Sequence, residues 1–195
     1  VSKVTSMWDM FEGATAFNNG GADTIKAWKT GLVTDMRYMF NEAAAFNQAI
    51  PTDGDKWDTA KVTKMESMFK GASAFNQDIG TWKTGLVTTM RYMFSGAAAF
   101  NQPIPKNGDK WDTAKVTSML HMFQGATAFN QELKTWDTKA VKNMKNMFKG
   151  AVAFNKELAG TSPAWDVSAV TSMEGMFQGA KAFDNEVKDT MKTWV

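Results

Sequence analysis

Several classes of protein are excluded by what this chain of 195 residues lacks. It has no cysteine, so it forms neither disulfides nor cysteine-based metal sites. No run of apolar residues approaches the roughly 18 that a transmembrane helix needs, so no membrane span is predicted. The triplet Asn-x-Ser/Thr does not occur, so no standard N-glycan is expected.

The chain also lacks an excess of charge of either sign. Its 22 basic and 20 acidic residues leave a net charge of +2, which gives no electrostatic reason to expect nucleic acid or an anionic membrane as a partner. The sequence shows no signal-peptide pattern and begins at Val1, and we expect it to be a fragment of a longer chain.

The aromatic residues and methionines, by contrast, are abundant and regularly placed. All 14 Phe, 14 of the 15 Met and 7 of the 8 Trp occupy fixed positions of one repeated unit. The pair Met-Phe marks each copy, at intervals of 25 or 29 residues. The pairs are Met10-Phe11, Met39-Phe40, Met68-Phe69, Met93-Phe94, Met122-Phe123, Met147-Phe148 and Met176-Phe177. We therefore predict a single repeat array over residues 1–195, with turns starting near 4, 33, 62, 87, 116, 141 and 170.

The first half of each copy has the apolar spacing of a helix. In the first copy, Val4, Met7, Met10, Phe11 and Ala14 fall on one stripe at about 100° per residue. In six copies a Thr follows this Val, where it is placed to cap a helix N-terminus, and in six copies a Gly ends the segment. This pattern predicts a short helix of about two turns in every copy.

The second half of each copy, Phe-Asn-Gln-x-Ile, predicts a short extended segment or an irregular stretch, and the pattern leaves both open. The predicted fold class is therefore α/β: a leucine-rich-repeat-like solenoid of seven turns, each a short helix plus a short extended or β segment. Stacking would bury the apolar positions of neighbouring turns against one another. The core positions predicted in this way include Met39, Phe40, Phe46, Met68, Phe69, Phe75, Trp82, Met93, Phe94, Phe100 and Trp111.

An asparagine follows the second Phe in six of the seven copies. These residues are Asn18, Asn47, Asn76, Asn101, Asn130 and Asn155, and the last copy has Asp184. One interpretation is an exposed row that binds a ligand. The favoured interpretation is a structural ladder in which each amide satisfies backbone groups of the adjacent turn.

The repeat V-T-x-M-x-x-M-F-x-G-A-x-A-F-N-Q-x-I-x-x-W-D-T resembles that of BspA-like leucine-rich-repeat surface proteins, from Val4 to Trp194. Departures include four-residue inserts in two copies and Lys142 in place of Thr. The resemblance implies a leucine-rich-repeat-like solenoid that is extracellular or attached to the cell surface, with roles in adhesion and protein interaction. It implies no enzymatic activity and supplies no functional residues to carry over.

The residues themselves suggest no chemistry. His121 is the only histidine and has no nucleophile pattern beside it, so it is interpreted as a surface residue. Asp53, Asp55 and Asp58 in one insert are close in sequence, but a calcium loop would need a bidentate Glu where Lys64 stands. The tryptophan row could stack on sugars, although its fixed place among the core positions favours burial. No catalytic residue, metal ligand or cofactor is predicted, and the ligand-binding residues are not identified.

The leading functional hypothesis is a non-enzymatic, surface-displayed interaction or adhesion module that binds a protein or a glycan. The alternative is a structural assembly element, in which further copies or flanking domains stack on the open ends of the array. Its motivation is that neither the first nor the last copy looks like a polar capping repeat.

Overall fold

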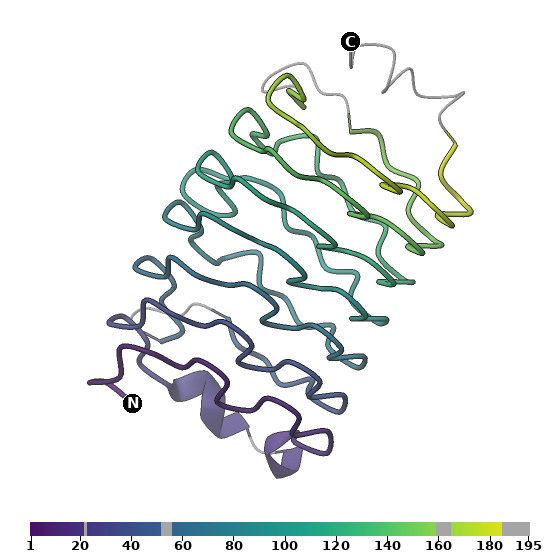
Figure 1. Cartoon of the computed structure of the whole chain (residues 1–195). Helices are drawn as coiled ribbons and strands as arrows, with labels where there is room; N and C mark the ends of the chain where they lie inside the picture. Colours follow the sequence, from purple (N-terminus) through teal and green to yellow (C-terminus); the bar gives the residue numbers. More distant parts are fainter. Residues whose placement is uncertain (22, 52–55, 159–164, 185–195) are drawn as a thin grey trace.

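The computed structural model describes residues 1–21, 23–51, 56–158 and 165–184. The chain forms a stack of seven coils, one per sequence repeat, that ascends from the N-terminal coil at the bottom of Figure 1. We number the coils 1 to 7 in chain order. Backbone hydrogen bonds join each coil to the next, for example from Thr63 N–H to the Thr34 carbonyl oxygen and from Trp111 N–H to the Trp82 carbonyl oxygen.

The predicted α/β fold class is wrong. The described residues contain two helices, both of the 3₁₀ type: η1 at Asn19–Gly21 and η2 at Asp23–Ala27. Both lie in coil 1, between Asn18 and Trp28, and not in the segment predicted to be helical. The described residues form no continuous β-strand either, and their β pairing consists of isolated bridges. The coils are therefore built from turns and loops, not from a helix and a strand.

The backbone of the Met-Phe segment shows why the helix does not form. Phe40 N–H donates to the carbonyl oxygen of Met68 in the next coil, at 2.9 Å, and not to a carbonyl four residues back. Ala43 N–H donates three residues back, to the Phe40 carbonyl oxygen at 3.1 Å. Tyr38 and Glu42 have φ angles of 55° and 57°, which interrupt a right-handed helix. The segment is a series of tight turns whose alternate N–H groups bond to the neighbouring coil.

The glycine that ends this segment does need the left-handed backbone that the sequence indicates. Gly71 has φ +69° and Gly96 has φ +73°, a region that residues with a Cβ adopt at a cost. Glu42 occupies the same position in coil 2 and adopts the same conformation. The left-handed residue closes a turn here and does not terminate a helix.

Of the two alternatives for the Phe-Asn-Gln-x-Ile segment, the structure has the irregular stretch, because none of its described residues lies in a β-strand or bridge. The parallel bridges lie instead in the Val-Thr-x segment, where they join Ser6 to Asp35, Asp35 to Lys64, and Thr89 through Ser118 and Asn143 to Ser172. Single bridges at equivalent positions form a ladder one residue wide in each coil. This ladder supports the surface described in the next subsection.

The core runs the length of the stack. The side chains at the Met, Phe and Trp positions of the central coils are fully buried, and they include Met39, Phe40, Phe46, Met68, Phe69, Phe75, Trp82, Met93, Phe94, Phe100 and Trp111. Equivalent rings stack from coil to coil: the ring centroids of Phe69 and Phe94 lie 5.7 Å apart at an angle of 7°. Stacked aromatic pairs add about 0.5–1.5 kcal/mol each beyond the area that they bury.

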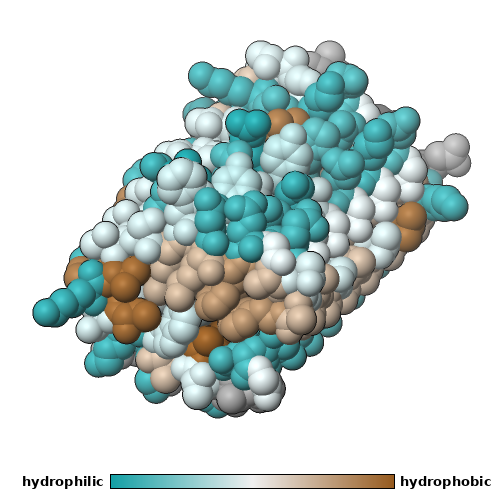
Figure 2. Space-filling model, turned by 60° about the horizontal axis from the view of Figure 1, so that its bottom comes forward, coloured by the Kyte–Doolittle hydropathy of each residue, from teal (hydrophilic) through white to brown (hydrophobic). Residues whose placement is uncertain are grey.

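The outer side of coil 1 shows core positions without cover. Met10, the equivalent of the buried Met39 and Met68, is exposed there, and Phe11 and Phe17 are only partly buried. Figure 2, which brings the bottom of Figure 1 forward, shows this apolar surface in brown between hydrophilic side chains. The contrast with coil 3 shows that the burial of each coil depends on its neighbours.

Candidate functional site

The candidate site is the surface above the ladder of parallel bridges, which we call the ladder face. Three positions of each coil make it up: the Thr after Val, the following bridge residue, and the residue after the first Met. The first row is Thr5, Thr34, Thr63, Thr88, Thr117, Lys142 and Thr171; the second is Ser6, Asp35, Lys64, Thr89, Ser118, Asn143 and Ser172; the third is Trp8, Arg37, Glu66, Arg91, Leu120, Lys145 and Glu174.

The threonines of the first row link the coils and do not cap helices. Thr63 Oγ1 donates to the Thr34 carbonyl oxygen at 3.2 Å, and Thr117 Oγ1 donates to the Thr88 carbonyl oxygen at 3.1 Å. The predicted helix N-caps are therefore wrong. These side-chain bonds, with the backbone bonds beside them, hold the ladder face in one conformation.

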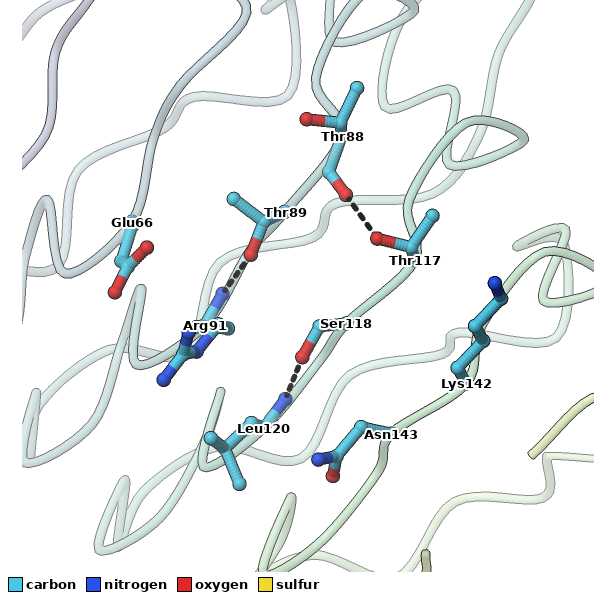
Figure 3. A pocket seen from close by; sticks show the side chains of 9 residues that line it. All are labelled: Glu66, Thr88, Thr89, Arg91, Thr117, Ser118, Leu120, Lys142 and Asn143. Carbon is cyan, nitrogen blue, oxygen red and sulfur yellow. Dashed lines mark hydrogen bonds between the residues drawn. The ribbon is translucent and has the colours of Figure 1, made fainter. Parts of the chain in front are cut away.

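A groove of about 640 Å³ lies on this face, over coils 3 to 6. Figure 3 shows the side chains around it, with Glu66 and Arg91 at one side and Lys142 and Asn143 at the other. Its lining is Glu66, Thr88, Thr89, Arg91, Thr117, Ser118, Leu120, Lys142 and Asn143. All but Leu120 are polar or charged, so the groove suits a ligand rich in hydrogen-bonding groups.

The chain has two arginines, and both stand at the same position of the ladder face. In coil 2, Asp35 and Arg37 form a bidentate pair: Nη2 and Nε of Arg37 lie 2.7 Å and 3.0 Å from the carboxylate. The Arg37 guanidinium also lies 4.7 Å from the Trp8 ring centroid. In coil 4, Thr89 replaces the aspartate beside Arg91, and its Oγ1 accepts only the Arg91 backbone N–H, at 3.5 Å.

The pairing in coil 2 perturbs the pKa of Asp35. Burial raises that pKa, but the hydrogen bonds from Arg37, together with the positive charges of Arg37 and Lys64, outweigh burial and hold the pKa below its ordinary value. A carboxylate whose pKa is lowered by folding stabilises the folded state above the unfolded-state pKa. That contribution is lost as the pH falls through the folded-state pKa.

We expect Asp35→Asn to be less stable than the wild type at pH 7, with a difference that shrinks as the pH falls below about 4. Urea unfolding midpoints of both proteins at pH 7, 5 and 3 measure it. Glu157→Gln, at an exposed acidic residue, is the control and should follow the wild type. If the urea midpoints of Asp35→Asn and the wild type differed as much at pH 3 as at pH 7, the ion-pair explanation would be contradicted.

His121 lies beside the groove, not at a reactive centre. Its ring stacks on Tyr92, with the ring centroids 4.7 Å apart at 6°, and its Nδ1 contacts Gln124 Oε1. Both His121 and Tyr92 have positive φ angles, of 55° and 56°. Within the described ranges, no three His, Cys, Asp or Glu side chains are placed to hold a metal ion. Asp53 and Asp55, considered for calcium, lie outside the described residues.

The asparagine row lies away from the ladder face and bonds from coil to coil. Asn76 Oδ1 accepts the backbone N–H of Asn101 at 2.9 Å and the side-chain amide of Gln102 at 3.1 Å. The same backbone bond to the amide oxygen of the preceding coil is made by Asn47, Asn76, Asn130, Asn155 and Asp184. These amide oxygens, from Asn18 to Asn155, are therefore engaged within the protein.

The tryptophan row is buried and hydrogen-bonded from Trp57 to Trp165, and Trp28 in coil 1 is partly buried. Trp82 Nε1 donates to the Ile50 carbonyl oxygen at 3.0 Å, and Trp111 Nε1 donates to that of Ile79 at 2.9 Å. Indoles that are buried in this way offer no face on which a sugar could stack. Sequence reasoning did not single out the groove or Arg91. The available signal was the substitution of Asp35 by Thr89 between two nearly copied segments that both keep the arginine.

The fold and the repeat together define a repeat protein. Residues 20–108 and 104–194 each match one family, described as "Mycoplasma protein of unknown function, DUF285", and the chain belongs to this family. The search of curated proteins gave no match, and neither did the search of solved structures. No helix in the described part of the chain has the length and apolarity to cross a membrane.

Proposed function

We propose that this chain is a non-enzymatic interaction or adhesion module, displayed outside the cell or on its surface, that presents the ladder face to a protein or glycan partner. The observation that carries the proposal is the groove of polar side chains on a surface held by bonds between coils. A surface that is already ordered before binding loses little conformational entropy when a partner docks. The resemblance of the repeat to BspA-like surface proteins supports the same role.

The experiment is a binding screen of the purified chain against immobilised glycans and extracellular-matrix proteins. Ser118→Trp places a large side chain in the groove and is expected to reduce binding at least tenfold. Ser73→Trp is the matched control, because Ser73 is an exposed serine that does not line the groove, and it should bind like the wild type. Binding that is lost equally in both variants, or absent from the whole screen, would contradict the proposal.

Sedimentation velocity separates this function from structural assembly. An interaction module is expected to sediment as a monomer and to form a larger species only with its partner. Self-association of the chain without any partner in the screen would favour the assembly element instead.

A further inference from the structure

We infer that the groove on the ladder face binds a carboxylated sugar, with the Arg91 guanidinium as the group that receives the ligand carboxylate. The inference rests on the proposed function and specifies the ligand class and the residue that selects it. Arg91 lines the groove in coil 4, beside Thr88, Thr89 and Glu66 (Figure 3).

The Arg91 guanidinium has unused hydrogen-bonding capacity. Its Nε is buried, and no acceptor among the described residues lies within hydrogen-bonding distance of it. No carboxylate in the described part of the chain lies within 4.0 Å of its nitrogens, and its nearest aromatic partner is the Tyr92 ring, 6.0 Å from the guanidinium carbon. The terminal nitrogens of this guanidinium are not buried and make no hydrogen bond within the described residues, so they are the groups that a ligand carboxylate would contact.

Coil 2 shows what such a guanidinium binds when a carboxylate is present. Arg37, at the equivalent position, is held by both oxygens of Asp35. Planar bidentate pairing with a carboxylate is the characteristic interaction of arginine. Because coil 4 has Thr89 in place of Asp35, the Arg91 guanidinium has no internal carboxylate, and its terminal nitrogens are left for a carboxylate from outside the chain.

The other lining residues favour a sugar over an acidic peptide. Thr88, Ser118 and Asn143 offer hydroxyl and amide N–H groups that can donate to sugar hydroxyls. The Thr117 hydroxyl already donates to the Thr88 carbonyl oxygen and can still accept from one. A peptide that binds by strand addition would need free backbone groups on the ladder face. The backbone here is already used between coils, since Met90 N–H donates to the Ser118 carbonyl oxygen at 3.0 Å.

The charges around the groove suit an anionic ligand. Lys142 stands where most coils have threonine and adds a second cation on the far side of the groove from Arg91 (Figure 3). Glu66 is the one acidic residue in the lining and repels an anion, so the lining keeps one net positive charge. Glu66→Gln is therefore expected to strengthen the binding of a carboxylated sugar.

The test is isothermal titration of the whole chain with tetragalacturonate, with its methyl ester, and with sialyllactose. At least one of the two acids is expected to bind, and the ester at least tenfold more weakly than tetragalacturonate if that acid is the ligand. Arg91→Gln should lower the affinity for the acid that binds by tenfold or more. Thr89→Asp should do the same while keeping the arginine, because it reproduces the internal pair of coil 2. Arg37→Gln is the matched control and should change the affinity less than twofold.

Several outcomes would overturn the inference. These are equal binding of acid and ester, an equal loss in Arg37→Gln and Arg91→Gln, or tighter binding of a hexaglutamate peptide that depends on Arg91. Failure of both acids to bind would also overturn it. If the chain still bound another glycan or protein of the screen, that failure would leave the proposed function standing.

Discussion

Trp82→Ala is expected to lower the free energy of unfolding by about 3–5 kcal/mol, the usual cost of removing a large buried aromatic side chain. Trp82 is fully buried in coil 3, with its ring centroid 6.3 Å from that of Trp57 and 6.0 Å from that of Phe69. The substitution also leaves the Ile50 carbonyl oxygen without its indole donor. Urea unfolding followed by near-ultraviolet circular dichroism measures the change.

Two variants separate packing from general damage. Trp82→Phe keeps a ring in the stack but removes the N–H group, so it should cost clearly less than the alanine variant. Leu86→Ala removes an exposed side chain of the same coil and should change stability by less than about 0.5 kcal/mol. A cost for Trp82→Ala no larger than that for Leu86→Ala would disprove the buried tryptophan stack.

Asn76→Ala is expected to lower the free energy of unfolding by about 1–3 kcal/mol. The cause is the loss of one acceptor that serves two donors, the Asn101 backbone N–H and the Gln102 side-chain amide. Both donors belong to coil 4, so the substitution loosens the contact between two coils. Hydrogen exchange at the Asn101 amide reports it directly, and this amide should exchange faster in the variant.

Asn76→Asp provides the control for this second prediction. It keeps an oxygen acceptor at the same place but removes the amide N–H₂ group. It should therefore be more stable than Asn76→Ala at neutral pH. Equal stability of the alanine variant and the wild type would show that the asparagine row contributes nothing to folding and would reopen the ligand-binding interpretation of that row.

The repeat pattern does not distinguish the two arginines, although their surroundings differ. Arg37 and Arg91 occupy the same position of nearly copied segments, so periodicity alone gives them the same role. They differ because residue 35 is an aspartate and residue 89 a threonine, which leaves one guanidinium paired and the other without a carboxylate. A comparison of the copies for their differences would have pointed to Arg91.

The spacing of the apolar residues was enough to predict a stacked repeat and to indicate which side chains are buried in it. Met68, Phe69 and Phe75 recur in every copy, and burial of a recurring apolar side chain needs only a neighbouring copy beside it. The structure leaves no surface of these three residues exposed.

The backbone conformation required the folded coils. Apolar residues three and four apart suit an amphipathic helix, but they also suit successive tight turns with bonds between residues three apart. The difference lies in the acceptor of each N–H group. That of Phe40 is the Met68 carbonyl oxygen, 28 residues further along the chain, a partner that no local pattern can reveal. The groove has the same origin, because its lining comes from four coils that meet only when the stack has formed.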